Sequence, residues 1–469
     1  MQNKCPIFWI NYIFNVTLHL EMKYNTYTLD NGLRIIHLPS DSKVVYCGYQ
    51  INAGTRNEEP GEEGLAHFCE HVTFKGTERR KAWHILNCLE SVGGDLNAYT
   101  NKEGTVYYSA ILKEHIARAV DLLSDIVFHS VYPQAEIDKE VEVICDEIES
   151  YNDSPAELIY DEFENILFKG SSLGHNILGT AEQVRAFKTE DALRFTQKLY
   201  RPDNAIFFAY GDIDFKKLVK LIQKALGECP KGRELACSTD CNSAETPTEK
   251  RIAEETPTGE TPTEEMEAGD ANHKVQSSKF NVQSKVAGQT IVMQKNTHQA
   301  HVMIGTRAYD VNDDRRMPLY LLNNMLGGPG MNAKLNLALR EHNGLVYTVE
   351  STMVAYGDTG TWSIYFGCAE HDVKRCLRLV RKELDKFMQK PLSDAQLKAA
   401  KKQIKGQIGV ACDNRENFAL DFGKSFLHYG WEKNVDRLYE QVDAITAAQI
   451  QAVAQELFDK DRLTTLIFK

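Results

Sequence analysis

Two stretches of this chain, about 250 residues apart, have similar sequences and predict an internal repeat. Residues 51–64 are INAGTRNEEPGEEG and residues 303–315 are MIGTRAYDVNDDR. Each is a β-rich run that enters Gly-Thr-Arg and an acidic loop before a helical pattern. The repetition favours two homologous halves.

The pattern around the first copy indicates the architecture of one half. Two β-rich runs flank Asn31-Gly32, which is typical of a hairpin turn. Further β-rich runs alternate irregularly with long helical patterns, such as 114–128 and 133–151. Strands followed by several helices predict an α+β fold, with two lobes that are each a mostly antiparallel sheet packed with helices.

The composition excludes several classes of protein. The chain has 469 residues, of which 42% are hydrophobic, an ordinary globular value. Its net charge of −12 argues against a nucleic-acid partner. No apolar run reaches the ~18–20 residues of a membrane span. The eleven cysteines form no C-x-x-C pair, which favours reduced, mostly buried thiols.

A polar segment separates the two halves. Copies of Glu-Thr-Pro-Thr start at Glu245, Glu255 and Glu260, and no aromatic residue occurs in 238–270. Such a segment has too little apolar surface to order itself. The sequence therefore predicts an N-terminal lobe over 23–236, a flexible acidic linker over 237–279 and a C-terminal lobe over 280–469.

Residues 1–22 form an extension whose nature stays open. They are apolar, but polar residues such as Asn11 and Asn15 interrupt the run and no small-residue cleavage site follows. An extended or misassigned start before Met22, an export signal and an ordered segment are the alternatives. An Arg-rich transit peptide is absent, which argues against a mitochondrial address. We expect a cytoplasmic protein, or an exported one if the extension is a signal.

The chemistry lies in one motif, H-x-x-E-H, at His67, Glu70 and His71. On a helix these side chains fall within one sector, because each residue turns the helix by about 100°. Two imidazoles one turn apart can bind Zn²⁺, and a neighbouring carboxylate can act on a water at the metal. A catalytic zinc needs a third protein ligand. Glu140 and Glu147 share one face of the helical pattern 133–151, and their spacing alone does not choose between them.

The motif and its continuation V-T-F-K-G-T resemble the inverted zinc motif of the pitrilysin-type metallopeptidases, in particular the processing-peptidase branch. The resemblance covers nearly all of 23–469 and includes GGDLNAYT, TVYYSA, LYRPDN and LREHNGLVYTV. It implies that Glu147 is the third ligand and that Glu140 supports the site. It also implies two lobes that face each other across a chamber, and one Zn²⁺ per chain.

Other positions take their expected roles from the same resemblance. Asn97, Ala98 and Tyr99 match an edge strand that pairs with the backbone of a peptide substrate. Arg340 and Tyr347 match a pair that reaches the substrate and the developing oxyanion. The turn Gly327-Gly328-Pro329-Gly330 matches a glycine-rich loop, but Ala333-Lys334 departs from the family's usual Ser-Arg, so no role is assigned to it.

The sequence thus predicts a zinc-dependent endopeptidase that cleaves unfolded peptides, with Glu70 as the general base. A targeting-sequence processing enzyme is a variant of this hypothesis. The alternative is a non-catalytic scaffold or partner subunit of the same fold. Such subunits typically lose part of the zinc set, whereas this chain keeps His67, Glu70, His71 and Glu147. Half-size members of the family typically pair, so we expect a homodimer or a dimer with a related subunit.

Overall fold

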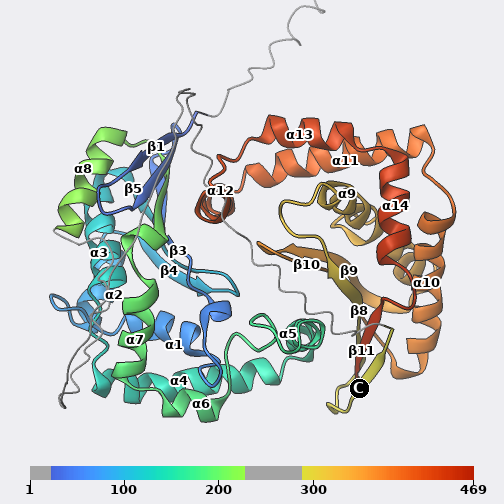
Figure 1. Ribbon diagram of the computed structural model, residues 1–469, viewed down its shortest axis with the longest axis horizontal. Coiled ribbons are helices and arrows are strands. Elements are labelled where there is room, and N and C mark those ends of the chain that lie inside the picture. Colours follow the sequence, from blue (N-terminus) through green and yellow to red (C-terminus); the bar gives the residue numbers. More distant parts are fainter. Residues whose placement is uncertain (1–22, 228–287) are drawn as a thin grey trace, which may run out of the picture. The chain divides into compact units, whose positions relative to one another are not determined.

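A computed structural model describes residues 23–227 and 288–469, which belong to one compact unit. The predicted extension 1–22 and the predicted linker 237–279 lie outside the described residues. The described part contains two β-sheets and the helices packed on them, as the sequence predicted (Figure 1).

The first sheet has the strand order β1-β2-β6-β3-β5-β4. Only β2 and β6 pair in parallel, and β4 lies at an edge of the sheet. The predicted hairpin around Asn31-Gly32 is the β1–β2 pair. The strands are β1 (Asn25–Thr28), β2 (Arg34–Pro39), β3 (Val44–Ile51), β4 (Asp95–Thr100), β5 (Thr105–Leu112) and β6 (Ala205–Gly211).

The second sheet has the order β7-β11-β8-β10-β9, which repeats the order β2-β6-β3-β5-β4 of the first sheet. Its parallel pair, β7 with β11, occupies the place of β2 with β6, and the other pairs are antiparallel. The shared strand order confirms the prediction of two related halves. The strands are β7 (Thr290–Met293), β8 (Ala300–Ala308), β9 (Val346–Ala355), β10 (Gly360–Cys368) and β11 (Thr464–Phe468).

The Gly-Thr-Arg alignment that suggested the repeat was out of register. In the β3–β5 and β8–β10 ladders, Ile51 and Ala308 each face the first residue of the partner strand. Ile51 therefore corresponds to Ala308. In this register Gly305 corresponds to Gly48 and not to Gly54.

A close approach of two strands explains the shared glycine. A Cβ atom on Gly48 would lie 2.3 Å from the carbonyl oxygen of Tyr107, and one on Gly305 would lie 2.2 Å from that of Trp362. Neither position can hold a side chain without displacing the neighbouring strand. The packing of both sheets thus requires a glycine at the position shared by Gly48 and Gly305. The two Gly-Thr-Arg triplets, in contrast, do not occupy equivalent positions in the two halves.

Helices cover both faces of each sheet. In the first half, α3 contacts β3 and β5, and α8 packs on α3 (Figure 1). In the second half, α9 packs on β9, and α10 and α14 pack together. The helices are α1 (Leu65–Thr73), α2 (Ala82–Glu90), α3 (Ile116–Phe128), α4 (Gln134–Asn152), α5 (Pro155–Leu167), α6 (Ala181–Ala186), α7 (Thr189–Leu199), α8 (Phe215–Leu226), α9 (Arg316–Gly327), α10 (Val373–Gln389), α11 (Asp394–Cys412), α12 (Arg415–Tyr429), α13 (Val435–Ala444) and α14 (Ala447–Leu457).

Each half supplies one helix to the sheet of the other half. Helix α12 places Phe418 and Phe422 in a buried cluster with Phe208 of the first sheet. Helix α5 places Phe163 in a cluster with Leu466 of the second sheet. The strands β6 and β10 are therefore buried on both faces along almost their whole length.

No helix within residues 23–227 and 288–469 is long and apolar enough to span a membrane. The seven cysteines in the same ranges are free thiols.

Candidate metal centre

The site is built on α1, whose amino-terminal end is capped by a distant carboxylate. The side chain of Glu58 is fully buried and accepts hydrogen bonds from the backbone N–H groups of Gly64 (3.1 Å) and Ala66 (2.8 Å). His175 Nε2 donates to the same carboxylate at 2.9 Å. A carboxylate at a helix amino terminus satisfies free N–H groups and favours the helix dipole. Glu58 therefore helps to fix where α1 begins.

Three side chains from α1 and α4 offer ligand atoms to one point. One ligand atom each from His67, His71 and Glu147 lies within 4.8 Å of the other two. The Glu147 Oε2 atom is 3.2 Å from His71 Nε2 and 3.7 Å from His67 Nε2. Ligand atoms around a tetrahedral zinc lie about 3.3 Å apart, given bond lengths of about 2.0–2.1 Å. The donor set and its spacing therefore fit a zinc ion.

Glu140 meets the other nitrogen of the same imidazole. Its Oε1 atom lies 3.1 Å from His71 Nδ1, and its Oε2 atom lies 2.5 Å from the Lys75 ammonium. A carboxylate on the far ring nitrogen of a metal-ligating histidine fixes its tautomer and orientation. The structure thus separates the two glutamates that the helical spacing left open, since only Glu147 joins the cluster of ligand atoms.

The protonation preferences of the two histidines differ. Burial, with a smaller contribution from His71, lowers the pKa of His67 to about 4. Burial also favours the neutral form of His71, but hydrogen bonds to Glu140 and Glu147 outweigh it and raise that pKa to about 9. The two carboxylates therefore attract a positive charge to this point. A divalent cation would satisfy the same attraction while both rings stay neutral.

Glu70 lies beside the cluster and outside the set of ligand atoms. Its Oε2 atom accepts a hydrogen bond of 2.6 Å from the hydroxyl of Thr100, the last residue of β4. Burial raises the pKa of the Glu70 carboxyl, and the Thr100 hydrogen bond opposes that effect. A buried carboxyl with a raised pKa is suited to accept and return a proton.

The predicted substrate strand is β4, which carries Asn97, Ala98 and Tyr99. Within the described residues β4 pairs only with β5, so its other edge has unpaired backbone groups. Burial raises the pKa of Tyr99 to about 12, and its ring packs edge-on against Tyr108. The strand therefore offers an unpaired edge that ends at Thr100, which hydrogen-bonds Glu70.

Arg340 and Tyr347 lie side by side in the second half. The Arg340 guanidinium is over the Tyr347 ring, 5.5 Å from its centroid, and the Tyr347 residue is 83% exposed. Arg340 belongs to the π-helical turn Asn336–Glu341, and Tyr347 lies on β9. Both line a cavity of about 840 Å³ that is also bordered by the turn Gly327–Gly330. The three features that the sequence singled out in this half are therefore neighbours.

Two residues of the site were not singled out from the sequence, although both lie in quoted motifs. Lys75 follows the zinc motif in V-T-F-K-G-T, and Thr100 ends GGDLNAYT. A lysine one turn beyond His71 on the same face was a detectable signal for a partner of Glu140. Thr100 offered none, because its contact with Glu70 depends on how β4 packs against α1.

Comparison with known proteins places both halves in one family. Residues 35–181 match the model described as insulinase (peptidase family M16), and residues 186–404 match the model described as peptidase M16 inactive domain. This chain belongs to peptidase family M16. The sequence prediction of a pitrilysin-type peptidase is confirmed.

Full-length relatives in the family carry the name zinc protease. An uncharacterized zinc protease of Bacillus subtilis is 29% identical over 444 residues, covering 94% of this chain and 97% of the relative. One from Streptomyces coelicolor is 29% identical over 435 residues, covering 92% of this chain and 87% of the relative. The similarity therefore extends over both halves.

Solved structures share the fold. A protease from Helicobacter pylori matches with a TM-score of 0.80 and 20% identity, over 96% of this chain and 100% of that one. A peptidase M16 inactive domain from Pseudomonas fluorescens matches with a TM-score of 0.78 and 16% identity, over 95% and 98%. The word inactive in the second family model suits the second half of this chain, because α9, the helix that follows β8, contains no His, Asp or Glu.

Proposed function

We propose that this chain is a zinc metalloendopeptidase. The observation that carries the proposal is the convergence of His67, His71 and Glu147 on one point, with Glu70 beside it. The family membership and the zinc-protease names of the relatives support the same activity.

His67, His71 and Glu147 would hold one zinc ion per chain, and Glu140 would orient His71. A zinc ion there would supply a Lewis acid that polarises a peptide carbonyl and makes a nearby water more acidic. The Glu147 side chain is 46% exposed, so one side of the site is open. An open fourth position is what distinguishes catalytic from structural zinc sites.

Glu70 would serve as general base and acid. Its carboxylate would accept a proton from the attacking water and return it to the leaving amine. The hydrogen bond from Thr100 holds one carboxylate oxygen, which leaves the other oxygen free for that transfer. We assign Glu70 to catalysis and not to metal binding, because His67, His71 and Glu147 form the ligand set without it.

The free edge of β4 would bind the substrate. A peptide in extended conformation can add to this edge through main-chain hydrogen bonds, with little demand on its sequence. Asn97, Ala98 and Tyr99 would be the pairing residues. A site of this kind, enclosed between two lobes, would accept unfolded peptides and exclude folded proteins.

Arg340 and Tyr347 would complete the site from the second half, with the Tyr347 hydroxyl donating to the oxyanion of the transition state. The exposure of Tyr347 supports this role, because a buried side chain could not reach a substrate. The working form would be a dimer, either of two copies or with a related subunit. In such a dimer the Arg340–Tyr347 pair could serve the zinc site of the partner.

The direct test is the Glu70→Gln variant. We expect it to bind zinc like the wild type, because Glu70 is not a ligand. We expect its cleavage of unstructured peptides to fall by about 10²–10⁴-fold, the usual contribution of a general base. Zinc content by elemental analysis and cuts mapped by mass spectrometry would measure both. Loss of zinc from this variant would show that Glu70 is a ligand.

The alternative is a non-catalytic subunit, in line with the word inactive in the name of the second family model. That model covers residues 186–404, whereas the whole zinc set lies before them. A wild-type chain that binds zinc at this site and cleaves no unstructured peptide, alone or with a related subunit, would favour this alternative.

A further inference from the structure

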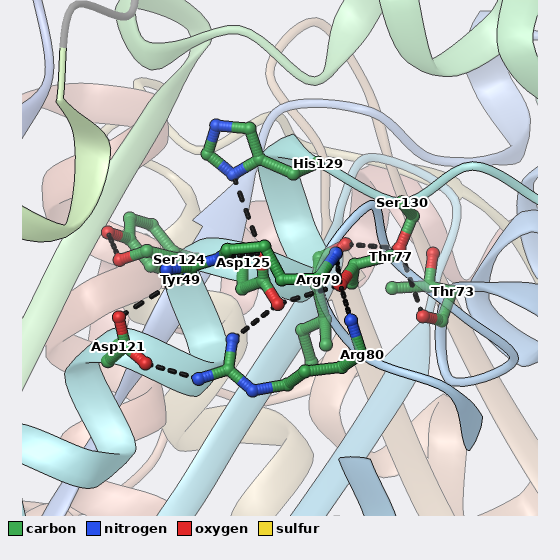
Figure 2. A network of polar contacts seen from close by, with 11 residues as sticks. Tyr49, Thr73, Thr77, Arg79, Arg80, Asp121, Ser124, Asp125, His129 and Ser130 are labelled. Atoms are coloured by element: carbon green, nitrogen blue, oxygen red, sulfur yellow. Dashed lines mark hydrogen bonds and ion pairs between the residues drawn. The ribbon is translucent and has the colours of Figure 1, made fainter. Parts of the chain in front are cut away.

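A network of polar contacts lies at the carboxyl-terminal ends of α1 and α3 (Figure 2). Its centre is Asp125 in the last turn of α3, whose side chain is fully buried. Burying a charged carboxylate destabilises the folded state unless hydrogen bonds or ion pairs compensate for the lost hydration. The contacts that satisfy it therefore indicate what the fold uses it for.

The hydrogen bonds to the Asp125 carboxylate come from the loop that leaves α1, and His129 Nδ1 lies 3.9 Å from its Oδ1 atom. The Thr77 hydroxyl donates to its Oδ2 atom at 2.8 Å, and Arg79 Nε donates to its Oδ1 atom at 3.0 Å. The Arg80 guanidinium bonds both Asp125 and Asp121 (Figure 2). Burial raises the pKa of Asp125, but these donors outweigh burial and lower it, so the carboxylate is charged at neutral pH.

The same loop is tied to the connection that leads into α4. The Ser130 hydroxyl lies 3.0 Å from the carbonyl oxygen of Thr73, the last residue of α1. The backbone N–H of Val131 donates to Gly76 at 3.1 Å, and that of Glu78 donates to His129 at 3.3 Å. Helix α4 begins three residues after Val131, at Gln134.

These contacts link Asp125 on α3 to the loop that leaves α1, and they link that loop to the connection into α4. His71 lies in the last turn of α1, and α4 carries Glu147. If the loop after α1 shifted against the α3–α4 connection, the distance from His71 Nε2 to Glu147 Oε2, now 3.2 Å, would change with it. Zinc ligands tolerate little change, because their bond lengths vary by only about 0.2 Å.

We propose that Asp125 is a positioning residue for the zinc site, which holds α1 and α4 at the separation that the ligands require. The proposal rests on the function proposed above. Asp125 touches neither the ligands nor the substrate. It acts through Thr77, Arg79 and Arg80, which hold the loop. The loop is in turn joined to the α3–α4 connection by the antiparallel bridge between Thr77 and Ser130.

The test compares Asp125→Asn with Asp121→Asn in the full-length, zinc-loaded protein. Asp121 pairs with the same two arginines but is 41% exposed, and its loss leaves every contact of Asp125 in place. Zinc affinity is measured by competition with a chelator, at a temperature at which circular dichroism shows both variants to be folded. We expect the affinity to fall about 10–100-fold in Asp125→Asn, as for groups that orient ligands. In Asp121→Asn we expect it to be unchanged.

A milder pair of variants keeps the test decisive if Asp125→Asn does not fold. Thr77→Val removes the hydrogen bond to Asp125 and those that the hydroxyl accepts from the backbone N–H groups of Arg79 and Arg80, and Thr77→Ser restores the hydroxyl. We expect weaker zinc binding for the valine variant and wild-type binding for the serine variant. A lowered melting temperature with unchanged zinc affinity, in whichever pair folds, would show that the network only stabilises the fold. A wild-type chain that binds no zinc would instead overturn the proposed function.

Discussion

His71 meets a different carboxylate at each of its ring nitrogens. Glu147 lies at Nε2 and Glu140 at Nδ1, although both glutamates project from one face of α4. A carboxylate such as Glu140, which is hydrogen-bonded to a ligating imidazole, raises the basicity of that imidazole. A carboxylate such as Glu147 would instead bind the metal directly. Two similar side chains thus differ in what they would contribute.

The two glutamates should therefore respond differently to the same substitution. Glu147→Gln should lose zinc during purification, because it removes one of three protein ligands. Glu140→Gln should keep zinc but bind it about 10–100-fold more weakly. Zinc per chain and a chelator titration measure both. The reverse pattern would mean that Glu140 is the ligand.

Thr100 offers a second test at the scale of single residues. Thr100→Val keeps the shape of the side chain but removes the hydrogen bond to Glu70, so the carboxylate loses its fixed orientation. We expect kcat to fall by about tenfold, with KM and zinc content unchanged, because the contact is to a general base. Thr100→Ser should restore the rate. Equal losses in both variants would show that the packing of the threonine methyl group matters and not the hydroxyl.

Much of the site was predictable because it is local in sequence. The H-x-x-E-H spacing places His67 and His71 on one helix face whatever the rest of the chain does. The contact of Thr100 with Glu70 joins a strand to a helix, and no periodic pattern encodes it. The same holds for Asp125, which looks like any polar residue in an amphipathic helix until its neighbours are known.

At the scale of elements, each sheet depends on a helix from the other half. Helix α12 was expected only as one of several helices, and α5 was not predicted, although Ser154-Pro155 marks its start and Leu158, Ile159 and Phe163 share one face. Long-range packing between complementary apolar surfaces determines which sheet a helix covers. Local helix propensity does not determine it.

Phe422 of α12 allows this arrangement to be tested. Its side chain is fully buried among aromatic rings, and it packs with Tyr24 and Phe208 of the first half. Phe422→Ala should lower the free energy of unfolding by about 3–5 kcal/mol, the usual cost of such a cavity. Urea denaturation measures it. Leu86→Ala on α2, where the side chain is 51% exposed, is the control and should change little. A loss below about 1 kcal/mol for Phe422→Ala would contradict the packing of α12 on the first sheet.

At the scale of the whole molecule, the two halves share one topology but not one chemistry. The first half carries the complete candidate zinc set, whereas the second contributes an exposed tyrosine with an arginine over its ring. The repeat was visible in the sequence, but its register was not. The triplets at Gly54 and Gly305 match by letters, while the strand pairing equates Gly305 with Gly48.

Because Glu70 lies in the first half and Tyr347 in the second, we expect inactive variants at these two positions to complement each other if the protein works as a dimer. Glu70→Gln and Tyr347→Phe chains should each be nearly inactive alone. If Tyr347 serves the partner's zinc site, mixed dimers should regain up to about half of one site's activity, because one composite site is then intact. Peptide cleavage after subunit exchange, followed by native mass spectrometry, measures this. Exchange without recovery would place Tyr347 in the site of its own chain, and a monomer at micromolar concentration would remove the dimer.

The central claim is that one zinc ion is held by His67, His71 and Glu147. Anomalous scattering from crystals of the protein, recorded on both sides of the zinc absorption edge, tests it most directly. The account predicts a single strong peak per chain, about 2.0–2.2 Å from the Nε2 atoms of both histidines and from a carboxylate oxygen of Glu147. A zinc-loaded crystal with no peak there, or with a peak bound by Glu70 or Glu140 in place of Glu147, would contradict it.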